Sequence, residues 1–176
     1  MPQWPLSEVG RARMRAGLGQ PWIADIGAIY CSTERKAIDS AEILAAHLSL
    51  PYHPIEELGE NDRSSTGFLP PDEFERVADD FFARPEESVR GWERAEDAQA
   101  RILAAVRAIE RGHRSGAAIA IVSHGAVGTL LYCALAGAPI SRRWDQPANG
   151  GGNFYRCTLH PPAVDSGWRP IDRDLR

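Results

Sequence analysis

The sequence predicts a single α/β domain in which helices cover both faces of a mostly parallel sheet, giving three layers. Short apolar runs alternate along the chain with longer segments whose apolar residues recur at helical spacing. The chain has 176 residues, the length of one domain with its own core. No linker, repeat or low-complexity tract divides it, so residues 1–176 are expected to form one unit.

Apolar runs mark the predicted strands. The run IGAIYCS at 26–32 contains β-branched and aromatic residues and is bounded by polar segments. The run AAIAIVS at 117–123 does not alternate with polar residues, so we expect that strand to be buried on both faces. Residues 51–58 are predicted to be extended. The segment 151–162 predicts one more strand, at an edge of the sheet.

Five segments are predicted to be helices, and the apolar residues of 33–50 and 93–112 have the spacing of amphipathic helices. Ser7 is a suitable N-cap for the first of them, and Ser32 or Thr33 for the second. Pro51 stops the second, and Gly112 ends the fourth. The predicted helices are 6–18, 33–50, 71–83, 93–112 and 125–137.

Composition excludes several classes of protein. A formal net charge of −4 without a basic cluster argues against a nucleic-acid binder. No apolar run approaches the roughly 18 residues of a membrane span, and the N-terminal segment lacks a signal peptide's apolar core. We therefore expect a cytoplasmic protein. The spacing of histidine, cysteine and carboxylate residues predicts no metal site, and no glycine-rich nucleotide loop is present.

Two of the predicted strand–helix junctions carry reactive side chains, CSTERKA at 31–37 and SHGAVG at 123–128. Ligands of α/β sheets bind at such junctions. Arg35 and Lys36 lie in the opening turn of a helix, where cations oppose the helix dipole unless an anion binds there. The alternative is a pair of solvated surface cations.

His124 follows one strand and precedes Gly125, which allows a ligand to approach the backbone closely. A helix N-terminus lowers a histidine's pKa and directs the ring into the cleft. The alternative is a histidine bonded to a neighbouring carbonyl group. Ser123 does not form the nucleophile elbow of a serine hydrolase, because Ile121 takes the place of the motif's first glycine.

The polar loop 59–71 is a third candidate. Glu60 offers a proton donor and Arg63 a further contact for an anion, unless the loop is simply hydrophilic. Phe68 and Trp92 lie in predicted loops and are candidates for contacts with a substrate or with a second copy in a homodimer.

Taken in order, four stretches resemble the histidine phosphatase superfamily, which has the phosphoglycerate mutase-like fold. PLSEVGRARM at 5–14 is similar to the family's first helix, and AIYCSTERKAIDSAEILA at 28–45 to its next strand and helix. LGE at 58–60 resembles the segment that carries the acid/base carboxylate. VSHGAVGTLL at 122–131 resembles the motif of the second catalytic histidine.

The resemblance implies a role for each matching residue. His124 corresponds to the histidine that binds the transferred phosphoryl group, and Glu60 to the donor that protonates the leaving oxygen. Lys36 falls on the family's phosphate-binding arginine, with Arg35 one position earlier, and either one is the predicted phosphate contact. Ser32 and Arg63 complete the predicted phosphate-binding set. The ligand is a small phosphorylated molecule or phosphate ion, and no cofactor is implied.

The chain departs from the family pattern at its beginning. The family's nucleophile is a histidine in an R-H-G motif after a first strand, whereas only MPQW precedes the helix at 5–14. We therefore expect a phosphoglycerate mutase-like sheet without its first strand, with unpaired edges, because of a misplaced start, a truncation or natural degeneration. The complete form would hydrolyse phosphomonoesters or act as a mutase, and the chain as given would be inactive. The alternative is a non-catalytic phosphate-binding or interaction module.

Overall fold

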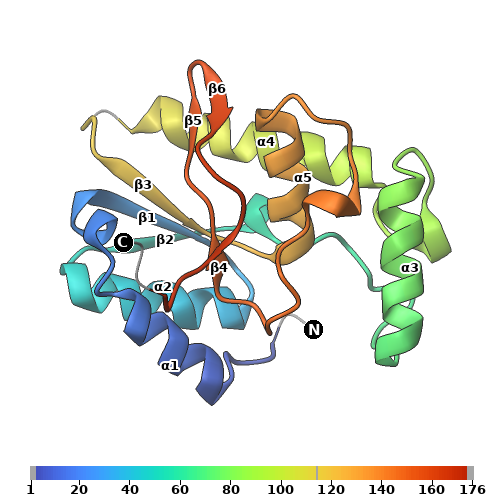
Figure 1. Cartoon of the computed structure of the whole chain (residues 1–176), viewed down its shortest axis with the longest axis horizontal. Coiled ribbons are helices and arrows are strands. Elements are labelled where there is room, and N and C mark those ends of the chain that lie inside the picture. Colours follow the sequence, from blue (N-terminus) through green and yellow to red (C-terminus); the bar gives the residue numbers. More distant parts are fainter. Residues whose placement is uncertain (1–2, 114, 174–176) are drawn as a thin grey trace.

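The computed structural model describes residues 3–113 and 115–173 and has the predicted three-layer α/β architecture. Its central sheet contains β1 (Ile26–Ser32), β2 (Tyr52–Ile55) and β3 (Ala118–Val122). All three strands are parallel, in the order β2-β1-β3. Figure 1 shows α1 and α2 on one side of this sheet and α4 and α5 on the other. The predicted strand at 26–32 is confirmed to the residue.

The first helical layer consists of α1 (Glu8–Gly17) and α2 (Arg35–Leu48). Ser7 caps α1 as predicted, because its hydroxyl oxygen accepts a hydrogen bond from the Gly10 N–H group at 3.1 Å. Alternate residues of β1 point toward α2 and pack on its apolar face. The buried core of this layer comprises Ile23, Ile26, Ile29, Cys31, Ala41, Leu44 and Ala45.

The second helical layer consists of α3 (Pro71–Ala83), α4 (Ala95–Gly112) and α5 (Gly125–Leu135). The remaining side chains of the sheet, Tyr30 and Ile121 among them, pack against this larger core. Short 3₁₀ turns lie at Pro21–Asp25, Glu56–Leu58, Val89–Gly91 and Arg142–Trp144. No helix in the described part of the chain is long and apolar enough to cross a bilayer.

β3 differs from its prediction as a fully buried strand. Within residues 3–113 and 115–173, it pairs with β1 along one edge only. Ala118 is exposed and the other four residues, Ile119 to Val122, are half-buried. A strand that has a neighbour on one side only leaves its other side accessible, even where helices cover its two faces.

The C-terminal region is also different from its prediction, since 151–162 adds no strand to the central sheet. It forms two small antiparallel pairs instead, β4 (Asn153–Phe154) with β7 (Arg169–Pro170) and β5 (Cys157–Leu159) with β6 (Pro162–Val164). Two consecutive prolines at 161 and 162 supply no N–H groups for a longer ladder. The chain therefore reverses there and packs over α5 (Figure 1).

Candidate functional site

The predicted site residues come together at one edge of the sheet. β1 and β3 end at Ser32 and Val122, and each is followed at once by a helix, α2 or α5. β2 ends at Ile55 and leads through a 3₁₀ turn to Glu60. Since the three strands are parallel, their carboxyl ends lie at the same edge, and residues far apart in sequence become neighbours there.

His124 lies at the centre of this group. It is the N-cap residue of α5, and its side chain is only 1% exposed. The ring Nε2 atom has no hydrogen-bond partner among the described residues, and Glu34 Oε1 lies 3.3 Å from it. Burial lowers the pKa of His124 below 6.5, although Glu60 and Glu34 act in the opposite direction. The imidazole is therefore neutral at neutral pH, and one nitrogen is available to a ligand.

Glu60 caps the N-terminus of α5. Its carboxylate accepts hydrogen bonds from the backbone N–H groups of Ala126, at 3.3 Å, and Val127, at 3.2 Å. These N–H groups have no partner within the helix, and the helix dipole favours a negative charge beside them. The guanidinium of Arg101 donates to the carbonyl oxygens of Gly59 and Glu60, which holds this turn in place. Glu60 thus reaches the turn that begins with His124.

Glu34 is a site residue that the sequence analysis missed. It is the N-cap residue of α2, and its half-buried side chain reaches both His124 and the Glu60 backbone N–H group, which donates to it at 3.1 Å. Burial by itself would raise the pKa of Glu34, but His124, the Glu60 N–H group and Lys36 lower it below 4.5. Its place in the CSTERKA junction, two residues before Lys36, was the available signal.

The predicted cations separate into two groups. Lys36 Nζ lies 3.7 Å from Glu34 Oε2, and Arg63 Nη2 lies 3.8 Å from Glu60 Oε2, so both belong to the site. The Arg35 guanidinium instead lies 2.5 Å from Asp39, a wholly buried carboxylate on the same helix. Of the two alternatives for the phosphate contact, this arrangement favours Lys36. The role of either cation in phosphate binding stays a prediction.

Arg63 is supported by two aromatic rings. Its guanidinium carbon lies 5.2 Å from the ring centroid of Phe74 and 5.6 Å from that of Trp92, within the range of cation–π attraction. Trp92 is only 2% exposed, which corrects its prediction as a loop aromatic that contacts a substrate or a second copy. Phe68 is exposed, and its predicted role stays open.

Ser32 has a role in local structure. It is wholly buried, and its hydroxyl oxygen accepts a hydrogen bond from the Glu34 N–H group at 3.1 Å. This bond holds the turn between β1 and α2 that carries Glu34. The part of Ser32 in phosphate binding stays a prediction, and we omit this residue from the proposed phosphate contacts.

The other histidines lie elsewhere in the described structure. His47 is in the last turn of α2, and the ring of His53, on β2, packs beside Tyr30 of β1. His113 ends α4, and His160 lies 3.4 Å from Glu110. The only His-Gly pair in the sequence is at 124–125. Across residues 3–113 and 115–173, no three histidine, cysteine or carboxylate residues are placed to hold a metal ion.

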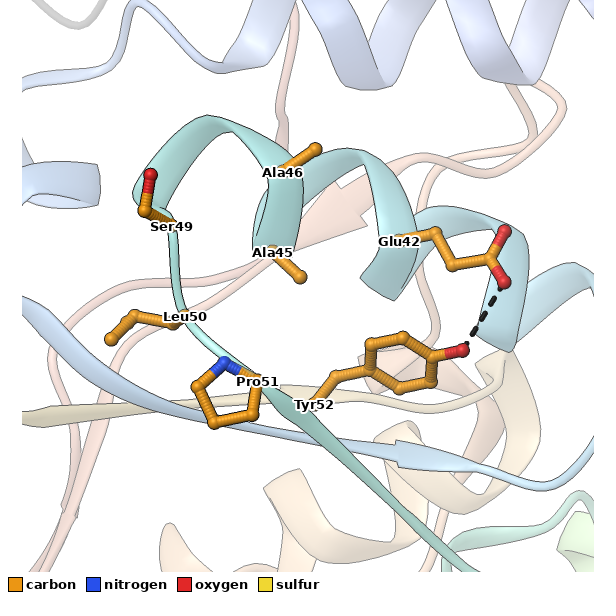
Figure 2. Close-up of a pocket in the computed structure, with 7 residues that line it drawn as sticks. All are labelled: Glu42, Ala45, Ala46, Ser49, Leu50, Pro51 and Tyr52. Carbon is orange, nitrogen blue, oxygen red and sulfur yellow. Dashed lines mark hydrogen bonds between the residues drawn. The ribbon is translucent and has the colours of Figure 1, made fainter.

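Two open depressions on the surface are lined by none of these site residues. One lies between α2 and β2, where the Tyr52 hydroxyl donates to Glu42 at 3.2 Å (Figure 2). The other lies between α1 and α2 and is lined in part by Arg11, Asp39 and His47. Neither of these two depressions is therefore part of the site at the strand ends.

The chain belongs to the histidine phosphatase superfamily. The model of that superfamily (branch 1) matches residues 2–160. The match includes both strand–helix junctions and the turn that carries Glu60. A search of the curated proteins gave no match. The match places this chain in a family of phosphoryl-transfer proteins.

Solved structures agree with this assignment. Bacillus stearothermophilus YhfR is 28% identical, with a TM-score of 0.72, over 93% of this chain and 84% of that one. A mycobacterial glucosyl-3-phosphoglycerate phosphatase is 20% identical, with a TM-score of 0.72, over 94% and 85%. The alpha-ribazole phosphatase of Shigella flexneri is 17% identical, with a TM-score of 0.69, over 99% and 88%. The last two likenesses show a shared fold only, the phosphoglycerate mutase-like one.

Proposed function

We propose that this chain provides a phosphomonoester site of the histidine phosphatase type, whose ligand is a small phosphorylated molecule. His124 and Lys36 bind the phosphoryl group and Arg63 adds positive charge. Glu60, after it has itself taken up a proton, protonates the leaving oxygen. One observation carries the proposal. In a member of this family, residues that follow three separate strands meet at the N-terminus of α5: His124, Glu60 and, through its contact with Glu34, Lys36.

We further propose that the 176 residues alone hydrolyse phosphomonoesters very slowly. Transfer to the enzyme requires a nucleophile in line with the bond that breaks. No second histidine of the described residues contacts His124, and each of the others is placed elsewhere. The same observation favours the second candidate function, a module that binds a phosphorylated ligand without hydrolysing it.

Two measurements on the purified chain test these proposals: calorimetric titration with inorganic phosphate, and release of p-nitrophenol from p-nitrophenyl phosphate. We expect His124→Ala to weaken phosphate binding about tenfold or more, since it removes a charge-assisted contact. His160→Ala, which changes a largely exposed histidine, is the matched control and should bind as the unmodified chain does. Turnover should stay close to the uncatalysed rate in all three proteins.

Each measurement has an outcome that contradicts one proposal. Equal phosphate affinities for His124→Ala and His160→Ala would show that the site is not where we place it. Robust turnover that disappears in His124→Ala would support the site but contradict the proposed lack of activity. Binding without turnover would favour the module.

A further inference from the structure

The start of α2 has an unusual arrangement of charge. Glu34 is the N-cap residue of this helix, but its carboxylate makes no capping hydrogen bond to it. N-cap residues are most often Ser, Thr, Asp or Asn, whose short side chains accept an N–H bond from the first turn of their own helix. Here the side chain turns toward α5 and the Glu60 turn, and only 13% of it is exposed. Its partners lie in the site described above.

Three groups of the kinds that bind a phosphate oxygen lie beside the Glu34 carboxylate. The Glu60 backbone N–H group donates to Oε1 at 3.1 Å. The buried His124 Nε2 atom lies 3.3 Å from the same oxygen, and the Lys36 ammonium lies 3.7 Å from Oε2. A backbone amide, an imidazole and an ammonium therefore converge on one carboxylate. A phosphate bound at His124 would need the same donors.

The balance of charge leads to the same conclusion. With His124 neutral, Lys36 and Arg63 carry two positive charges, and Glu34 and Glu60 carry two negative charges. Glu60 already occupies the N–H groups at the start of α5. A dianion that entered this neutral group would be repelled by the carboxylate closest to His124.

We propose that the Glu34 carboxylate is an internal anion that occupies the phosphate position, so that phosphate binds at His124 only after Glu34 moves away. Glu34 thereby keeps the affinity of the site for phosphate low. It makes the site specific for ligands whose other contacts offset the free energy needed to displace the carboxylate. This inference rests on the proposed function, because it concerns the same site.

The test compares the affinity for inorganic phosphate of the unmodified chain, Glu34→Gln and Glu42→Gln by calorimetric titration. Glutamine has the shape of glutamate, and its amide oxygen still accepts the Glu60 N–H bond, but the negative charge is gone. We expect Glu34→Gln to bind phosphate about tenfold or more tightly than the unmodified chain. Glu42→Gln is the matched control, because Glu42 lies on the same helix and pairs with Arg35 rather than with the site. It should leave the affinity unchanged.

The outcomes separate this inference from the proposed function. Tighter binding by Glu34→Gln that disappears when His124→Ala is added supports both. Binding that depends on His124 but is unchanged or weakened in Glu34→Gln overturns the inference and leaves the proposed function standing. A lack of any binding that depends on His124, in both backgrounds, overturns both.

A second measurement needs no substitution and so does not depend on the folding of a variant. If phosphate displaces Glu34, the Glu60 backbone amide exchanges the Glu34 carboxylate for a phosphate oxygen as its acceptor. Its resonance should then shift in an NMR titration of the ¹⁵N-labelled chain with phosphate. A Glu60 amide that stays unchanged while phosphate saturates the site, or throughout a titration without binding, overturns the inference.

Discussion

Two adjacent cations at the start of α2 serve different partners. Arg35 pairs with Asp39, which also receives the Arg11 guanidinium at 2.6 Å and the Leu6 N–H group at 2.9 Å. Lys36 pairs with Glu34 instead. Successive residues on a helix point about 100° apart, so neighbours in sequence face different surroundings. Arg35 therefore pairs within α2, at the carboxylate that Arg11 of α1 also contacts, whereas Lys36 faces the strand ends.

This difference predicts opposite effects for two matched substitutions. Lys36→Gln should weaken phosphate binding about tenfold, because it removes the site's closest ammonium group. Arg35→Gln should leave phosphate binding within about twofold and lower the free energy of unfolding by about 1 kcal/mol, the scale of a partly exposed ion pair. Calorimetric titration and urea unfolding measure the two effects. A loss of phosphate affinity in Arg35→Gln alone would assign the contact to Arg35.

At the scale of elements, α5 connects the site to the C-terminal region. The Tyr155 hydroxyl donates to the Gly128 carbonyl oxygen at 2.9 Å, and the Trp168 ring lies over Gly128. Trp168 is itself held in place, because its Nε1 atom donates to the Trp144 carbonyl oxygen at 3.0 Å and its ring packs edge-on against Tyr155. Because Gly128 has no side chain, the C-terminal region packs closely against α5.

Gly128→Ala should lower the free energy of unfolding by about 1–3 kcal/mol, the cost of overpacking a filled site. A Cβ atom there would lie 2.8 Å from the Trp168 ring. Gly112→Ala, at the end of α4, is the matched control, because a Cβ atom there meets nothing within 4 Å. It should be neutral or stabilise the chain by up to about 1 kcal/mol. Equal effects of the two substitutions in urea unfolding would contradict this packing.

Local patterns predicted most of these elements, since each depends on neighbours in sequence. The proline at 71 and the spacing of apolar residues predicted α3 to the residue, and Gly112 marked the end of α4. The apolar run of β3 by itself predicted burial on both faces, because such a run does not reveal how many strands lie beside it. The small sheet of β5 and β6 packs against α5, and such a contact has no signature in a single segment.

At the scale of the whole molecule, the site exists because the sheet is parallel. His124 and Glu60 were predicted from their own motifs, but the contact between Glu60 and Val127 spans 67 positions of sequence. Glu34 was missed because its contacts, too, are with residues that are distant in sequence. Its partners His124 and Glu60 come from other strand ends, and its position within the CSTERKA junction says nothing about the direction of its side chain.

The buried site should make the stability of the whole chain depend on pH. The pKa of His124 is below 6.5 in the folded chain, so between that pKa and 6.5 the unfolded chain binds more protons. The free energy of unfolding therefore falls as the pH falls through this range. Glu34, whose pKa is below 4.5, contributes stability that is lost only at more acidic pH.

The His124 contribution is at most about 1.4 kcal/mol per pH unit. Urea unfolding at about pH 7.5 and about pH 5.5 measures it in the unmodified chain, His124→Gln and His160→Gln. The contributions of titratable groups that all three proteins share cancel in the comparison. Any loss of stability in His124→Gln that is independent of pH cancels as well. The unmodified chain and His160→Gln should lose more stability between the two pH values than His124→Gln does. Equal losses in all three proteins would mean that the folded chain protonates His124 as readily as the unfolded chain does.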